Sequence, residues 1–337
     1  MTGSVVGRTH IGGLEVSRLG LGAMVLTRSF GEPDPAESVA TFDAALEAGI
    51  NFVDTADSYG AGENEELVGR LIRGRRDRVV LATKFGLVPT GDGRVVVDGR
   101  PDYVRSACDR SLQRLGVDHV DLYYQHRVDP DVPVEETVGA MSSLVAAGKV
   151  RHLGLCEADA EQLRRATAVH PIAALESEWS LWARQIEADV LATARDLGVG
   201  IVPYSPLGRG FLAGAIRHGT VLGRGDLRAE DPRLAGEHLE RNLQLIGQLQ
   251  TIADRIHATP AQLALAWLMS KGDDVVPIPG VERRQLLAEN VASVEVDLGA
   301  ADIEFLDSIF SPGAASGNPD QTLLRGQSVM GSGGERR

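Results

Sequence analysis

Strand-like and helix-like segments alternate along most of this chain, and that order restricts its fold more than any other feature. Most of the helix-like segments carry apolar residues at helical spacing and stop at a glycine, as at Gly49, Gly74 and Gly116. The expected strands are residues 18–24, 51–54, 78–84, 119–126, 150–155, 172–176, 199–205 and 274–279, and the expected helices are residues 35–48, 63–73, 101–115, 133–147, 158–169, 186–197, 260–270 and 283–291. Eight such pairs predict an α/β protein with a closed parallel (β/α)8 barrel, the TIM barrel.

An open doubly wound sheet is the rival architecture, and it would need a G-x-G-x-x-G turn after its first strand. The sequence contains no such turn. A length of 337 residues suits one large barrel, so we expect a single domain over residues 1–310. The Gly/Ser-rich segment 311–337 is expected to be a mobile tail, in which Leu323 and Leu324 are candidates for docking.

Three further segments depart from the strand–helix repeat. Gly12 and Gly13 predict a tight turn in an N-terminal β-hairpin over residues 8–18, which would close one end of the barrel. Residues 88–99 indicate a hairpin or flap after the third strand, and residues 208–237 form an unusually long connection after the seventh. For these two long loops at the carboxyl-end rim, a lid and a disordered surface loop are both open interpretations.

The composition argues against several classes of partner. A net charge of -13 and the lack of a long basic run make nucleic acid an unexpected partner, and no apolar stretch is long enough to span a membrane. The two cysteines have no metal-binding spacing, nor do the eight histidines, so we expect no metal site and reduced thiols. With no apolar export segment near the N-terminus, the expected location is cytoplasmic.

Polar residues end or follow three successive strands. Asp54 ends the second strand, Lys84 the third and His126 the fourth, while Tyr59 lies in the loop after Asp54. Lys84 is one of only three lysines in a chain that otherwise uses arginine, which raises the question of what its amine does. Because the carboxyl ends of parallel strands meet at one rim, these four side chains are predicted to gather there.

Together the four residues fit a proton donor that faces a carbonyl oxygen. A cation near Tyr59 would lower the pKa of its phenol, and Lys84 is the candidate cation. Asp54 would compensate the buried ammonium, and His126 would orient the substrate oxygen. Taken singly, each residue also has a plainer structural interpretation: Asp54 as a loop cap, Tyr59 as a rim aromatic, Lys84 as a surface strand end and His126 as a core histidine.

The segments NFVDTADSYG, LATKFG and DLYYQHRVD resemble those of the aldo-keto reductase family, in the right order. Five further segments resemble the family too: GLEVSRLGLGAM, EWSLWAR, YSPLGRGF, PAQLALAWL and PIPG. In these segments the sequence is similar to the auxin-induced-like, perakine-reductase-like and pyridoxal-reductase-like branch. The resemblance implies a (β/α)8 barrel, NADPH/NADP+ as cofactor and reversible reduction of an aldehyde or ketone. It implies that Asp54, Tyr59, Lys84 and His126 form a catalytic tetrad, with Tyr59 as proton donor.

The same resemblance implies a cofactor site and a substrate pocket. The implied cofactor residues are Cys156, Glu157, Glu176, Tyr204, Ser205, Pro206, Leu207, Gly208, Gly210, Gly280, Arg283, Arg284, Glu289 and Asn290. Arg283 and Arg284 stand where a 2′-phosphate would bind, which favours NADPH over NADH, although a solvated helix start is the plainer interpretation. Met24, Phe85 and Trp179 are expected to line the substrate pocket beside Tyr59 and His126; for Trp179 a half-buried rim position stays open.

Three positions depart from the family pattern, and one of them, Leu286, replaces a polar residue that is often found against the 2′-phosphate. Cys156 stands where the family has serine, and Glu176 stands where it often has glutamine. A Glu176 carboxylate would place negative charge near the nicotinamide and shift preference toward the oxidised cofactor. A second hypothesis is a cofactor-binding regulatory subunit with little turnover. The expected partner is a small carbonyl compound, and the sequence indicates neither which one nor the oligomeric state.

Overall fold

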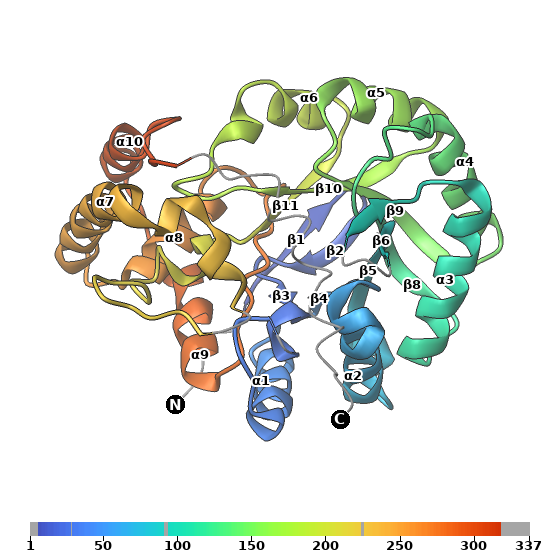
Figure 1. Cartoon of the computed structure of the whole chain (residues 1–337), viewed down its shortest axis with the longest axis horizontal. Coiled ribbons are helices and arrows are strands. Elements are labelled where there is room, and N and C mark those ends of the chain that lie inside the picture. Colours follow the sequence, from blue (N-terminus) through green and yellow to red (C-terminus); the bar gives the residue numbers. More distant parts are fainter. Residues whose placement is uncertain (1–5, 28, 91–93, 224–225, 318–337) are drawn as a thin grey trace.

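Parallel strands form the centre of the molecule and helices surround them (Figure 1). This computed structural model describes residues 6–27, 29–90, 94–223 and 226–317. One seven-stranded sheet has the order β11-β10-β9-β8-β5-β4-β3, and every neighbouring pair in it is parallel. Its strands are β3 (Leu21–Gly22), β4 (Phe52–Asp54), β5 (Val80–Phe85), β8 (Val120–Gln125), β9 (Val150–Cys156), β10 (Ile172–Glu178) and β11 (Gly200–Tyr204).

The eighth expected strand closes the barrel. On one side, the Val276 amide donates to Ile201 O at 2.9 Å. On the other side, the Gly20 amide donates to Pro277 O at 2.9 Å and the Gly22 amide to Pro279 O at 3.2 Å. Proline has no N–H to donate, so this segment is not a regular strand, but its carbonyl groups still accept from β3. The predicted (β/α)8 barrel is confirmed.

The helices between the strands begin and end close to the expected residues. They are α1 (Pro35–Glu47), α2 (Glu63–Ile72), α3 (Pro101–Leu115), α4 (Val134–Ala146), α5 (Ala160–Val169), α6 (Val190–Asp196), α8 (Pro260–Met269) and α9 (Arg284–Ala292). Local chemistry sets these ends. The Asp34 carboxylate accepts from the first amides of α1, and Thr259 and Gln262 form a capping box at the start of α8.

Two further helices correct the sequence analysis. Helix α7 (Gly236–Arg255) follows the long connection, and α10 (Ala300–Ile309) comes after α9, which was expected to be the last helix. Neither is a crossover between two strands, so the strand–helix alternation does not indicate them. The first part of the expected tail, residues 311–317, is described and lies against α7, where the Ser316 amide donates to Asn242 at 2.8 Å. Residues 318–337, with Leu323 and Leu324, lie outside the described residues.

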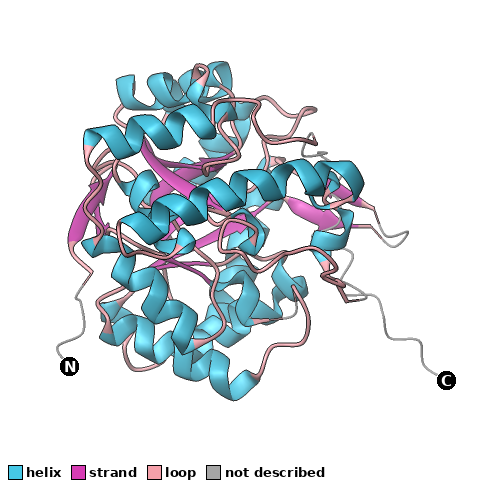
Figure 2. Ribbon diagram, turned by 90° about the vertical axis from the view of Figure 1, so that its left-hand side faces the viewer, coloured by secondary structure: helices cyan, strands magenta, loops and turns pink. Residues whose placement is uncertain are grey.

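Two hairpins lie at opposite ends of the barrel (Figure 2). The expected N-terminal hairpin is present as β1 (Arg8–Ile11) and β2 (Leu14–Ser17). At its turn, a Cβ on Gly12 would meet Ala173 O at 2.2 Å, so the hairpin sits directly against the barrel. The expected hairpin after the third strand is present as β6 (Leu87–Pro89) and β7 (Val95–Val97), whose connection at residues 91–93 lies outside the described residues.

Side chains along each barrel strand alternate between two cores. Ala82 of β5 and Leu122 of β8 belong to the apolar cluster inside the barrel, together with Ile11 of the hairpin. Leu81 and Tyr123, one residue away on the same strands, belong to the larger cluster between barrel and helices. This period of two decides which strand-end residues point toward the barrel axis.

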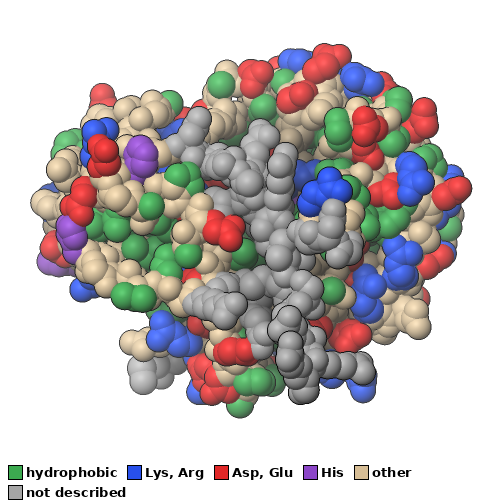
Figure 3. Space-filling model, in the orientation of Figure 1, with side chains coloured by type: hydrophobic (Ala, Val, Ile, Leu, Met, Phe, Trp, Pro, Cys, Tyr) green, Lys and Arg blue, Asp and Glu red, His purple; other side chains and the backbone are tan. Residues whose placement is uncertain are grey.

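None of the described helices has both the length and the apolar character needed to cross a bilayer. On the face shown in Figure 3, acidic and basic side chains are interspersed over the helices.

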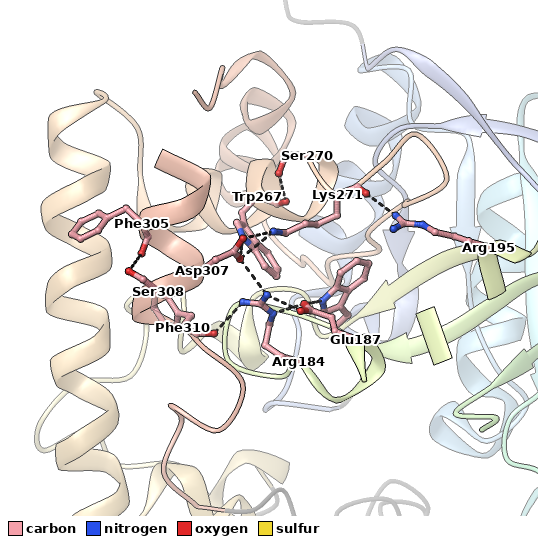
Figure 4. Close-up of polar contacts among 11 residues, drawn as sticks. Arg184, Glu187, Arg195, Trp267, Ser270, Lys271, Phe305, Asp307, Ser308 and Phe310 are labelled. Carbon is pink, nitrogen blue, oxygen red and sulfur yellow. Dashed lines mark hydrogen bonds and ion pairs between the residues drawn. The ribbon is translucent and has the colours of Figure 1, made fainter. Parts of the chain in front are cut away.

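A polar cluster fastens α10 and the segment after β10 to the barrel (Figure 4). Arg184, which is 8 % exposed, pairs with Glu187 and donates to Phe310 O at 3.0 Å, and its Nη2 lies 3.2 Å from Asp307 Oδ1. Its guanidinium carbon lies 4.6 Å from the centre of the Trp267 ring. Two carboxylates and an aromatic face therefore offset the cost of burying this cation.

Arg184→Met is expected to lower the free energy of unfolding by about 2–3 kcal/mol, because it leaves hydrogen-bonding groups of two carboxylates and a carbonyl without their charged donor. Arg105→Met removes an exposed pair with Asp102 and serves as the control, with an expected loss below about 0.5 kcal/mol. Urea denaturation of both variants measures the difference. Equal losses would contradict the anchoring role of Arg184.

Candidate active site

A cavity of about 490 Å³ opens at the carboxyl ends of the barrel strands. Asp54, Tyr59, His126 and Glu176 lie along it, and so do residues from the ends of β3 and β11, from the long connection after β11 and from α9. Carboxyl-end loops build the active sites of (β/α)8 enzymes, so this cavity is the candidate active site.

Three neighbouring strands bring the expected tetrad together. Asp54 ends β4, Lys84 lies in β5 and His126 follows β8, while Tyr59 begins a 3-10 turn after β4. The Lys84 ammonium pairs with Asp54 Oδ1 and donates to Thr55 O at 3.0 Å. It also lies 5.3 Å from the centre of the Tyr59 ring, and the rings of Tyr59 and His126 are 6.0 Å apart, edge to face.

The plainer interpretations of Lys84 and Asp54 do not fit the structure, whereas Tyr59 is half-buried at the rim, as its plainer interpretation has it. Lys84 is completely buried, so it is not a surface strand end. Asp54 pairs with that lysine rather than capping the loop after β4. His126 has Ser58 Oγ 3.5 Å from its Nδ1, and its other edge is free of any hydrogen bond to the described residues. The four side chains thus form one connected group at the cavity.

A second carboxylate changes the charge balance around Lys84. Glu176 Oε2, at the cavity end of β10, lies 3.3 Å from the Lys84 amine. Burial works against the ammonium charge, yet Asp54 and Glu176 together raise the pKa of Lys84 well above its ordinary value. Burial, and then the nearby Asp54 charge, raise the pKa of Glu176 to about 8. Burial also raises the pKa of Asp54, although the Lys84 charge and hydrogen bonds to Lys84 and Glu176 oppose that rise. At neutral pH the two buried carboxyl groups therefore hold a proton between them, beside the Lys84 ammonium.

This shared proton bears on the expected role of Glu176. A protonated carboxyl has one donor and one acceptor oxygen, so while Glu176 holds the proton its side chain resembles the glutamine that the family often has there. Its effect on the preference between the two cofactor forms stays a prediction.

Lys84 acts on the pKa of the phenol in the expected direction, but burial outweighs it. Burial raises the pKa of Tyr59 above its ordinary value, and the nearby Lys84 charge offsets only part of that rise. Burial, with the charges of Arg127 and Lys84, holds the pKa of His126 well below its ordinary value. The site therefore presents a protonated phenol beside a neutral imidazole.

Most of the residues assigned to the cofactor line the same cavity, and four do not. Tyr204, Ser205, Pro206, Leu207, Gly210, Gly280, Arg283, Glu289 and Asn290 line it with Glu176, as does Met24 of the expected substrate pocket. The Arg284 side chain instead pairs with Glu37 on the outer surface, with 2.9 Å between Nη2 and Oε2.

The other three cofactor candidates have structural contacts beside the cavity. The Cys156 thiol is buried and lies 3.7 Å from Glu176 Oε2, to which it donates. Glu157 accepts from the Glu178 amide at 2.7 Å. A Cβ on Gly208 would lie 2.7 Å from the Trp182 ring, so this glycine allows close packing.

Phe85 and Trp179 are corrected as substrate-pocket residues, because neither lines the cavity. Phe85 follows the inward-pointing Lys84 by one residue, so the pleat turns it outward, where it stacks on Tyr123 with 4.9 Å between ring centres. Trp179 packs edge to face on Trp267 and donates to Glu187 at 2.8 Å.

Several cavity residues were not found from the sequence. They are the arginines Arg127, Arg209, Arg217 and Arg228, with Phe30 from the loop after β3. For Arg209, Arg217 and Arg228 the available signal was the concentration of arginine in residues 208–237.

Trp182 fixes the long connection over the cavity. Phe211 stacks on the Trp182 ring at 4.4 Å between centres, and the Arg233 guanidinium lies 4.4 Å from the same ring. Arg233 is almost fully buried and pairs with Asp231 and Glu178. The described part of this connection is thus an ordered wall of the cavity, which decides against the disordered-loop interpretation there.

Comparison with known proteins agrees with this geometry. The sequence model of the aldo/keto reductase family matches residues 18–310. The chain belongs to the aldo/keto reductase family. It is 46% identical over 293 residues to a probable aldo-keto reductase 1 of Glycine max, which covers 86% of this chain and 84% of that protein.

Solved structures of other aldo/keto reductases have the same fold. A glycerol dehydrogenase from Gluconobacter oxydans superposes with a TM-score of 0.82 and 29% identity, over 93% of this chain and 97% of that one. An aldo/keto reductase from Klebsiella pneumoniae, solved in complex with NADP and acetate, gives a TM-score of 0.71 and 28% identity, over 94% and 99%.

Glu176→Gln is expected to remove a pH-dependent loss of stability from this aldo/keto reductase. In the folded protein the pKa of Glu176, which shares a proton with Asp54, is raised to about 8, whereas the unfolded chain releases that proton near 4.5. The wild type therefore loses stability relative to the variant as pH rises through that interval, at about 1.4 kcal/mol per pKa unit. Urea denaturation at pH 5, 7 and 9 measures the difference between the two proteins. A difference that stays constant with pH would show that Glu176 is not protonated in the fold.

Proposed function

We propose that this aldo/keto reductase catalyses the reversible NADPH-dependent reduction of an aldehyde or ketone to an alcohol. The observation that carries this proposal is the buried Lys84–Asp54 pair next to Tyr59 and His126 at the cavity. A protonated phenol, a fixed cation and a neutral imidazole in one place suit protonation of a carbonyl oxygen.

The cavity fits a nicotinamide dinucleotide phosphate. Its lining runs from the tetrad to the start of α9 and includes Arg283, Arg209 and Arg217, which suit phosphate groups. The backbone segments at Gly22 and Gly280 lie close to each other there, since a Cβ on Gly22 would meet Ile278 O at 2.8 Å and Gly280 N at 3.4 Å. Tyr204, Ser205, Leu207 and Gly210 lie between these ends and are proposed to hold the nicotinamide half. When bound, the reduced nicotinamide supplies the hydride.

The residues of the chain supply the proton and the orientation. We assign Tyr59 as the proton donor, because burial keeps its phenol protonated until the substrate oxygen takes up negative charge. The Lys84 ammonium then stabilises the phenolate that remains, and Asp54 keeps that ammonium in place. His126, neutral and beside the phenol, orients the substrate oxygen by donating a hydrogen bond.

Tyr59→Phe is expected to lower kcat by about 10²–10⁴-fold, because the ring remains but the proton donor is lost. Its dissociation constant for NADPH should stay within about twofold of wild type, because the phenol oxygen is assigned to the carbonyl substrate. NADPH absorbance with a panel of reactive aldehydes measures turnover, and fluorescence titration measures binding. A wild-type protein that binds NADPH but oxidises none of it would contradict the proposal.

Arg283→Gln is expected to weaken NADPH binding by roughly 10- to 100-fold. This factor corresponds to the loss of one hydrogen bond to a charged group, which contributes about 1.5–3 kcal/mol. NADH, which lacks the 2′-phosphate, should be affected much less. Arg284→Gln is the matched control, since the neighbouring Arg284 pairs with Glu37 away from the cavity. Equal losses in both variants, or equal losses for NADPH and NADH, would remove Arg283 from this role.

A further inference from the structure

Arg127 is a cavity residue for which the tetrad chemistry has no use. It directly follows His126 at the carboxyl end of β8, and it lines the cavity together with His126, Tyr59 and Tyr204. Its position next to the histidine places it at the end of the cavity where the carbonyl group is proposed to react, and not at the α9 end that holds Arg283.

The hydrogen-bonding groups of Arg127 are only partly used. Its Nη1 donates to His126 O at 2.6 Å. Its Nε is buried and has no hydrogen-bond partner, and no carboxylate of the described residues lies within ion-pair distance of its guanidinium. A buried donor without a partner costs free energy, so this arrangement favours a ligand that supplies the acceptor.

The charge of Arg127 is likewise not neutralised by a direct partner. Burial opposes its charge, but Tyr204, Glu157 and Glu176 lie near enough to raise the pKa of Arg127 above its ordinary value, so it is a permanent cation. The cation beneath the site, Lys84, already has Asp54 as its partner. Arg228 in the same cavity is different, because its guanidinium pairs with Asp226 at 2.6 Å and lies over Phe30.

The unused edge of the guanidinium has the shape that recognises a carboxylate. With Nη1 bonded to the backbone, Nε and Nη2 remain on one side of the planar group. Two parallel N–H donors at this spacing match the two oxygens of a carboxylate. A phosphate also accepts from such a pair, but a carboxylate matches its planar geometry with one charge for one cation.

We propose that Arg127 binds a carboxylate group of the substrate, so that the preferred carbonyl compounds of this enzyme are aldehyde acids or oxo acids. The inference rests on the proposed carbonyl reduction and adds to it the chemical class of the substrate. Arg127 is in this sense a specificity-determining residue, while the proton transfer remains with Tyr59.

Two pairs of substrates that differ only in the carboxylate test the proposal. Phenylglyoxylate and its methyl ester place the group next to the carbonyl, and 4-carboxybenzaldehyde and its methyl ester place it across a ring. The measurement is the ratio of kcat/KM for acid over ester in wild type, Arg127→Gln, Arg127→Lys and Arg228→Gln. We expect wild type to prefer the acid of at least one pair, and Arg127→Gln to lower that ratio at least tenfold, mainly through KM.

The control variants separate recognition from general charge. Arg127→Lys keeps the charge without the planar fork and should retain part of the ratio, whereas Arg228→Gln should leave the ratio as it is in wild type. An unchanged ratio in Arg127→Gln, or an equal fall in Arg228→Gln, overturns the inference. Activity on the esters without any preference for the acids overturns it too, and leaves the proposed carbonyl reduction standing.

A binding measurement tests the same site without turnover. Benzoate titrated into the protein saturated with NADP+, followed by calorimetry, should bind at least tenfold more weakly to Arg127→Gln than to wild type, while benzamide should bind weakly to both. Inorganic phosphate that competes with benzoate at equal affinity would overturn the assignment to a carboxylate. Arg127-dependent benzoate binding in a protein that reduces no carbonyl compound would support the anion site and contradict the proposed function.

Discussion

The buried ammonium of Lys84 is the constraint around which this active site is arranged. A lysine with no exposed surface is stable as a cation only beside an acceptor of opposite charge, and Asp54 on the neighbouring strand supplies it. Because β4 and β5 are parallel neighbours, the two strand ends meet at one rim and the pair forms without a loop. Tyr59 and His126 then lie against a charge whose position the barrel itself determines.

Glu176 shows how burial sets the charge of this site. Two buried carboxyl groups lie against one ammonium, and a single positive charge cannot compensate both acids. A proton that Asp54 and Glu176 share at neutral pH resolves this conflict. The site then keeps one balanced ion pair beneath the phenol, and the remaining cation at that end of the cavity is Arg127, which is available to a ligand.

The wall of the cavity depends on contacts far from the reacting atoms. Trp182 lies between Phe211 and Arg233, so both ends of the described connection after β11 hold the same indole. Arg184 joins the neighbouring segment to α10 through Asp307 and Phe310 O (Figure 4). Helix α10, which the strand–helix alternation did not indicate, therefore supports the segment on which the cavity wall rests.

The sequence by itself determined the barrel, the order of its units and the four residues that are proposed as the tetrad. Caps such as Asp34 and Thr259, terminal glycines such as Gly116, and apolar strands that end at Asp54 and Lys84 are local signals, and local chemistry produced the expected elements. Family resemblance added a further part of the cavity lining.

Only the tertiary structure decided which neighbours of those residues face the cavity and which charges they carry. The pleat sends Lys84 inward and Phe85 outward, and Arg284 meets Glu37 while Arg283 remains at the cavity. The proton shared by the two buried carboxyl groups, the high pKa of Tyr59 and the free edge of Arg127 arise from burial and from partners distant in the chain. These properties belong to packing, because desolvation and charge pairing depend on which segments meet in space rather than on adjacent residues.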